Sequence, residues 1–327
     1  MAEPIRSFTF SRLPPHLSFA VLGVASVVLF WRTLRELAAL ALSADAYSYI
    51  LLIPVISAFV LYLERRKVFA GIRTYRSPAV LALLAGSLAM YGLFALDLIN
   101  PPADYLLSIR VVSMLLVWVA AFALCYGPPA LAAARFPLLL LLLLVPIPLN
   151  WMEKIVTALQ WGAAEATYAL FQLAGVPMFR VGVNFELPVV GIEIARECSS
   201  IHSACALFVA GLLVGHLFLR SLGAKICLTL MTLPIAMFTN AVRIVTLWFL
   251  ATKVDIGFLY GNLHRNGGIL FSLAALSILM GFLSLLRKLE GRGQPPEASR
   301  RMDRKRRTNA NEDCASLSDP AAEITKL

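Results

Sequence analysis

The chain has 327 residues, of which 59% are hydrophobic and 15% charged, and its formal net charge is +10. An average soluble domain carries about 25% charged residues, so this composition excludes a water-soluble globular protein. The basic residues cluster at the edges of apolar segments and in the C-terminal tail. That distribution is typical of residues that orient a membrane protein, and it argues against a nucleic-acid partner.

Apolar segments taken in chain order predict eight transmembrane helices, since about 20 apolar residues cross a bilayer. We expect the spans at roughly 17–35, 47–63, 78–97, 105–125, 135–150, 199–219, 225–250 and 266–286. The predicted fold class is therefore an all-α polytopic membrane protein, whose lipid neighbours are its first partners. Residues 1–290 form this membrane domain, and residues 291–327 form a disordered, basic cytoplasmic tail.

Four groups of basic residues predict one orientation. They lie in the N-terminal residues, in the segment 64–76, in the short connection 220–225 and in the tail 287–307. With eight crossings all four groups fall on the same side, and an excess of Lys and Arg marks the cytoplasmic side. We expect both termini in the cytoplasm.

The long segment between the fifth and sixth spans is predicted to lie outside. Its first part, Ile155 to Ala174, mixes apolar residues with Gln and Glu, which favours an interfacial or re-entrant helix over a ninth crossing. Its second part, Met178 to Ala195, alternates and is rich in Val, Ile and Phe. This pattern predicts a small β-hairpin or extended lid.

An ionisable side chain in a membrane helix marks a candidate functional site, because burying Arg in hydrocarbon costs at least about 2.5 kcal/mol. Arg243 is the clearest case, and Asn240 lies three residues before it on nearly the same helical face. The alternative is an arginine that extends to the outer interface. Asn240 argues against it, because it adds a second costly polar group.

Three chemically active residues are predicted at one depth. At about 1.5 Å per residue, Arg243 lies about 27 Å above Lys225, Cys198 about 33 Å above Arg220, and His264 about 35 Å above Arg287. The hydrocarbon core is about 30 Å thick. A thiol, a guanidinium and an imidazole therefore meet near the outer surface.

These groups are the parts of a cysteine acyl-transfer site. Cys198 would open the sixth span, where the positive helix end favours a thiolate. His264 would act as general base and then as acid, and Arg243 would hold a carboxylate or an oxyanion. His202, four residues after Cys198, is an alternative base, although we favour packing or substrate contact for it. An inert Cys198 remains the competing interpretation.

Neither a metal nor a cofactor is predicted. The five cysteines are an odd number, and none of them has the CxxC or CxxH spacing of a metal site.

The chain resembles the exosortase/archaeosortase family of multi-pass membrane cysteine transpeptidases between about Tyr47 and Leu286. The motifs that carry the resemblance are YSYILLIPVISAFVLYLERR, VPIPLNWMEKIVTALQ, ECSSIHS, NAVRI and LHRNGG. The family's proposed catalytic Cys, Arg and late His or Arg correspond to Cys198, Arg243 and His264. Arg265 leaves open which residue fills the third role.

The resemblance has consequences for substrate and site. It implies a bacterial inner-membrane enzyme, with a catalytic part at about 135–286, that cleaves the sorting signals of exported proteins. Such a signal consists of a short motif, a transmembrane helix and a basic tail at the C-terminus of the exported protein. The resemblance also implies that the acyl group passes through a thioester on Cys198 to an acceptor. Asn240, His202, Glu197 and Arg265 are the expected supporting or substrate-binding residues.

The sequence also departs from the family pattern. Ser200 stands where the family usually has Gly, and Tyr49 and Ile50 replace a His-Gly pair, which indicates a divergent subfamily. Two alternatives stay open: a transporter or flippase for a lipid-linked glycan, and an assembly component for exopolysaccharide. Neither of them needs Cys198.

Overall fold

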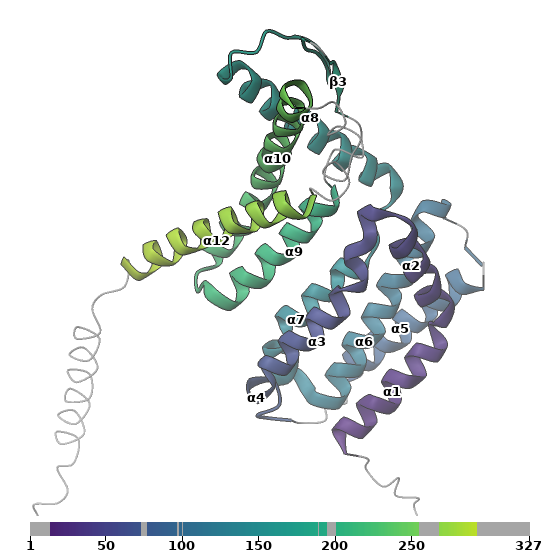
Figure 1. Ribbon diagram of the computed structural model, residues 1–327. Coiled ribbons are helices and arrows are strands. Elements are labelled where there is room, and N and C mark those ends of the chain that lie inside the picture. Colours follow the sequence, from purple (N-terminus) through teal and green to yellow (C-terminus); the bar gives the residue numbers. More distant parts are fainter. Residues whose placement is uncertain are drawn as a thin grey trace, which may run out of the picture.

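The computed structural model describes residues 14–72, 77–96, 98–99, 101–188, 190–194, 201–254 and 268–292. Helices dominate this part of the chain (Figure 1). Six helical segments are individually long and apolar enough to cross a membrane, and two bent helix pairs pass the same test together, which gives up to eight spans. The all-α polytopic membrane fold predicted from the sequence is confirmed.

The first half of the chain forms one helical bundle, in which α1, α3 and α6 run in nearly the same direction (Figure 1). Its long helix α6 packs against both α5 and α1, and α3 packs against α7. The elements in order are α1 (Pro15–Leu29), α2 (Trp31–Ser43), the 3-10 helix η1 (Asp45–Leu51), α3 (Ile53–Leu63), α4 (Arg65–Val68), α5 (Pro78–Ala95), α6 (Ala103–Ala133), α7 (Arg135–Leu140) and the 3-10 helix η2 (Leu141–Leu144).

The second half packs around the longest helix, α10, which contacts α8, α9 and α12. Its elements are α8 (Leu149–Leu173), β1 (Phe179–Val181), β2 (Asn184–Glu186), β3 (Ile192–Glu193), α9 (Ile201–Phe218), α10 (Leu222–Lys253) and α12 (Gly268–Arg292). The 3-10 helix η1 packs on α9 and so joins the two halves.

Two predicted spans are bent. The first, expected at 17–35, turns by 71° between α1 and α2 at Phe30. The polar residues of α2 are the physical reason, because a straight continuation would bury them in hydrocarbon. The fifth, expected at 135–150, ends at Leu144, and α8 leaves it at 96°. Pro146 and Pro148 cannot continue the helical hydrogen bonds.

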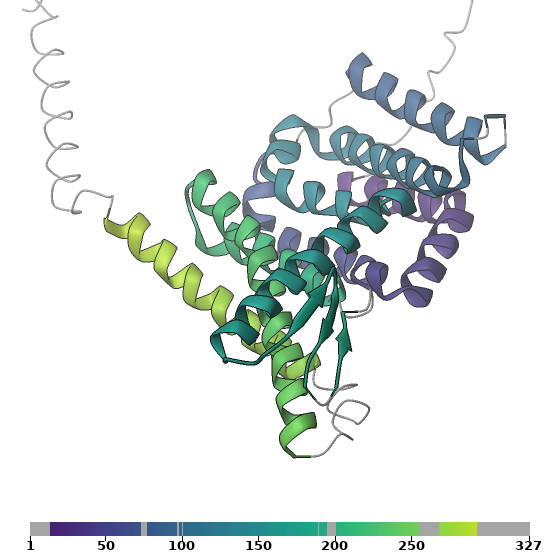
Figure 2. The same cartoon turned by 90° about the horizontal axis from the view of Figure 1, so that it is seen from above.

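The segment after this bend forms the predicted helix and the predicted β structure. The helix expected at 155–174 begins earlier, at Leu149, and ends at Leu173. The expected lid at 178–195 contains a three-stranded antiparallel sheet in the order β1–β2–β3. The sheet lies beside α8 and the far end of α10 (Figure 2). Its buried side chains form a small core with both helices: Ala164, Phe171, Phe185, Leu187, Ile194 and Trp248.

Contacts between elements bring three of the predicted cytoplasmic segments to one end of the molecule. The Glu290 carboxylate in α12 accepts hydrogen bonds from the backbone N–H groups of Arg220 and Ser221. The His216 imidazole of α9 lies 3.1 Å from the Glu64 carboxylate after α3. The basic segments therefore share a face, as the charge pattern predicts, and assigning that face to the cytoplasm stays a prediction.

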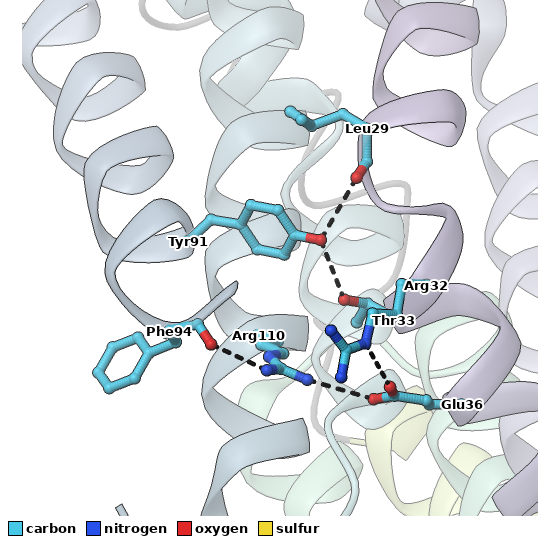
Figure 3. A network of polar contacts seen from close by, with 7 residues as sticks. All are labelled: Leu29, Arg32, Thr33, Glu36, Tyr91, Phe94 and Arg110. Atoms are coloured by element: carbon cyan, nitrogen blue, oxygen red, sulfur yellow. Dashed lines mark hydrogen bonds and ion pairs between the residues drawn. The ribbon is translucent and has the colours of Figure 1, made fainter. Parts of the chain in front are cut away.

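The opposite end of the first bundle is held by a polar network between α2, α5 and α6 (Figure 3). The buried Arg110 guanidinium donates to the Phe94 carbonyl at 2.8 Å and pairs with the Glu36 carboxylate at 3.4 Å. The Tyr91 hydroxyl lies 3.4 Å from Thr33 Oγ1 and 3.3 Å from the Leu29 carbonyl. The network joins α5 to the bend between α1 and α2.

Candidate active site

A cavity of about 550 Å³ lies between α9, α10 and α12. Its polar lining comes from one level of the three helices: His202 and Ser203 from α9, Thr239, Asn240 and Arg243 from α10, and Ser272 from α12. Below them the wall is apolar and includes the small residues Ala206, Ala210, Ala236 and Ala275. The cavity therefore has a polar mouth and an apolar floor.

The three helices are held together at their opposite end, and this sets the common level. The Glu290 hydrogen bonds tie the end of α12 to the connection between α9 and α10. An α-helix rises about 1.5 Å per residue. Counted along each helix from this joined end, the distance is about 24–27 Å to His202, to Asn240 and to Ser272. The Ser203 and Ser272 hydroxyls lie 3.2 Å apart, which joins α9 to α12 at that height.

The structure brings three of the predicted site residues together. Asn240 is buried, Arg243 is partly buried, and His202 is exposed at the mouth of the cavity. Arg243 lies about 32 Å along α10 from Leu222, close to the thickness of the hydrocarbon core. A guanidinium at this level can hold an anionic or polarised oxygen atom, because it stays charged and offers a rigid set of donors.

The remaining predicted site residues lie outside the described residues. These are Cys198 and Glu197, in the segment before α9, and His264 and Arg265, in the segment before α12. Both segments lead directly into helices that line the cavity. The predicted roles of these four residues stay predictions.

The chain before Cys198 is held at Ile194, the last described residue of that stretch. The Ile194 side chain is 1% exposed. Its N–H donates to the Val183 carbonyl at 3.1 Å, and its own carbonyl accepts from the Gln160 side chain of α8. Nearby, the Trp248 indole donates to the Val190 carbonyl at 3.1 Å. Helices α8 and α10 therefore fix the strand that leads toward Cys198.

An ion pair holds the other edge of the sheet. The Arg180 guanidinium of β1 donates to both oxygens of the Glu165 carboxylate, at 2.7 and 3.0 Å. The arginine also lies over the Tyr168 ring, at 5.4 Å.

Sequence reasoning missed two residues. Arg110 gives the same signal as Arg243, an ionisable group within a predicted span, and the structure pairs it with Glu36, away from the cavity lining. Gln160 gives only a weak signal, a polar residue in an apolar helix. Its role becomes visible only through its hydrogen bond to Ile194, which lies 34 residues further along the chain.

Comparison with known proteins gives one match. A family model described as transmembrane exosortase matches residues 31–281. No curated protein and no solved structure matches the chain. The matched range begins in α2 and ends in α12, and so includes the cavity and both segments that lead into it. The chain therefore belongs to the transmembrane exosortase family.

Proposed function

We propose that this protein is a membrane cysteine transpeptidase that cleaves C-terminal sorting signals of exported proteins. The observation that carries the proposal is the cavity that presents His202, Asn240 and Arg243 at one level between α9, α10 and α12. This cavity offers a cation and hydrogen-bonding groups at its mouth. Two of the helices that line it, α9 and α12, directly follow in the sequence the two segments that contain the candidate nucleophile and base.

Chain connectivity supports the assignment of Cys198 and His264. An extended chain spans at most about 3.6 Å per residue. Cys198 stands three residues before Ile201, where α9 begins, and His264 stands four residues before Gly268, where α12 begins. The covalent chain thus keeps both residues near the two helix ends that flank the cavity.

The proposed reaction is acyl transfer through a thioester. The Cys198 thiolate attacks the scissile carbonyl carbon, and Arg243 stabilises the oxyanion that forms. When the C–N bond breaks, His264 donates to the leaving amine the proton that it took from the thiol. The acceptor nucleophile then displaces the thiolate. Asn240, His202, Glu197 and Arg265 support the site or contact the substrate.

An open side of the cavity supports a membrane-embedded substrate. Ile269, Leu273 and Leu276 of α12 line the cavity and are exposed to 70%, 56% and 38%. Exposed apolar side chains at this depth face lipid. The transmembrane helix of a substrate can therefore approach this side from the bilayer, and the substrate's motif then lies at the polar mouth of the cavity. The basic tail of such a substrate would then lie on the same side of the membrane as the basic face of this protein.

The proposal places the active site on the outer side of the bacterial inner membrane. Reporter fusions test this orientation: a fusion at Gly291 should report the cytoplasm and a fusion at Asn184 the outside. The opposite result at either position would place Cys198 on the wrong face for an exported substrate.

Replacement of Cys198 tests the chemistry. Cys198→Ser should abolish processing of a co-expressed substrate that carries a sorting signal. Cys227→Ser is the matched control, because Cys227 is a free, exposed cysteine of α10, and it should leave processing unchanged. A transporter, a flippase or an assembly component would keep its function in both variants, and that outcome would refute the proposal.

A further inference from the structure

A second cavity, of about 530 Å³, lies in the first bundle, far from the residues of the candidate site in the sequence. Its lining residues come from α1, α3, α5, α6, α7 and η2. Along α1 it extends from Phe19 to Leu29, which corresponds to about 15 Å along the helix axis. The cavity is thus an elongated groove parallel to the predicted direction of the lipid chains.

The groove offers almost no polar surface. Its lining is apolar apart from Ser26, Ser57 and the indole N–H of Trp118. Ser26 Oγ donates to the Gly23 carbonyl at 2.7 Å and accepts from Trp118 at 3.0 Å. Ser57 Oγ donates to the Pro137 carbonyl at 2.8 Å. Because these polar groups already have partners inside the protein, nothing in the wall attracts water.

The surroundings determine what can fill such a groove. The cost of an empty apolar cavity grows with its volume, and apolar cavities stay dry and take up apolar molecules. The helices that form the groove belong to the candidate membrane spans, so the surrounding medium is hydrocarbon. A lipid chain is therefore the apolar molecule at hand.

Basic residues at one end of the groove specify the head group. Leu61 of α3 and Leu138 of α7 line the groove. Arg135 stands three residues before Leu138 on α7, a spacing that puts it on the face of that leucine. Arg65 begins α4, just after α3 ends and four residues after Leu61; its guanidinium donates to the Tyr62 carbonyl at 2.9 Å and lies over the Tyr62 ring at 4.0 Å. Both arginines are exposed. The carboxylate of Glu64, the acidic residue beside Arg65, lies 3.1 Å from the His216 imidazole of α9.

We propose that this groove binds one chain of an anionic phospholipid, with the lipid phosphate held by Arg65 and Arg135. Basic side chains beside a crevice between membrane helices favour anionic head groups, and here both cations lie close in sequence to residues that line the same end of the crevice. The site is independent of the acyl-transfer proposal, because none of its residues lines the cavity of Arg243.

Filling the groove tests the chain-binding part. An added Cβ at Gly23 or at Gly86 meets no atom within 4 Å, but only Gly23 lines the groove. The full chain, purified in mild detergent, is mixed with phosphatidylglycerol and examined by native mass spectrometry. Gly23→Phe should lower the bound fraction severalfold, and Gly86→Phe should bind as the unchanged protein does. Ala58→Phe, on the opposite wall, provides a second filling variant.

Equal lipid binding by the unchanged protein, Gly23→Phe and Ala58→Phe would overturn the proposal. So would a loss of binding in Gly86→Phe as large as in the filling variants, because the loss would then be unrelated to the groove.

The head-group part is tested with Arg65→Gln and Arg135→Gln combined, which leaves Arg66 and Lys67 to orient the chain. The combined variant should bind phosphatidylglycerol about 25-fold more weakly, about fivefold for each removed cation. Its binding of phosphatidylcholine with the same chains should stay unchanged. Arg287→Gln, an exposed arginine of α12 at the same end, is the control. Equal affinity of the unchanged protein for both lipids would refute an anionic site.

Discussion

Removing the Gln160 side-chain amide should break the hydrogen bond that holds the end of the sheet to α8, four residues before the proposed nucleophile. Gln160 is 9% exposed, and its amide donates to the Ile194 carbonyl, four residues before Cys198. In Gln160→Leu this buried carbonyl loses its donor, which costs about 1–3 kcal/mol. If this cost destabilises the conformation in which the segment after Ile194 presents Cys198 to the substrate, processing should decrease about 5- to 150-fold.

The matched control lies on the same helix. Gln172 also donates from its side-chain amide, to the Tyr168 hydroxyl at 2.7 Å, but this contact is exposed and does not involve the strand. Gln172→Leu should therefore process substrate at the normal rate. Both variants are assayed with a detergent-solubilised enzyme and a synthetic substrate, so that kcat and KM are measured separately. A positioning role for Gln160 predicts a lower kcat with little change in KM.

Gln160→Glu separates positioning from general destabilisation. A carboxylate cannot donate to the Ile194 carbonyl, whereas a protonated acid can, and burial raises the pKa of a carboxyl group. The kcat of this variant should therefore rise relative to the unchanged enzyme as the pH falls. A normal kcat in Gln160→Leu, or an equal loss in the Gln172→Leu control, would refute the reasoning.

Three further outcomes are expected. Arg243→Lys keeps the charge but loses the rigid donor fork, so processing should fall severely while membrane insertion is retained; near-normal processing would reduce Arg243 to an interfacial anchor. His264→Ala should abolish processing and His202→Gln should retain much of it, whereas the reverse pattern would make His202 the base. Gly211→Leu should lower the thermal stability, because a Cβ there would lie 2.6 Å from a side-chain atom of α10. Gly281→Leu, where a Cβ meets nothing within 4 Å, is its control, and equal melting temperatures would contradict the packing argument.

The sequence alone determined the membrane architecture, because hydrocarbon imposes a simple rule on every residue that enters it. Segments of sufficient length and apolarity must be helical, and basic residues gather on one side. The predicted spans, the helix before the sheet and the β structure near 178–195 follow from these local patterns. The same rule selected Arg243 and Asn240, because a polar group within an apolar helix is conspicuous without any knowledge of its neighbours.

Only the tertiary structure decided where polar groups find their partners. Arg110 and Arg243 give the same signal in the sequence, yet one is paired with Glu36 in the first bundle and the other lines a cavity of the second. The bend at Phe30 and the Gln160–Ile194 hydrogen bond likewise depend on contacts between elements distant in sequence. Periodicity and composition describe one segment at a time, whereas a cavity or a buried hydrogen bond is a property of several segments packed together.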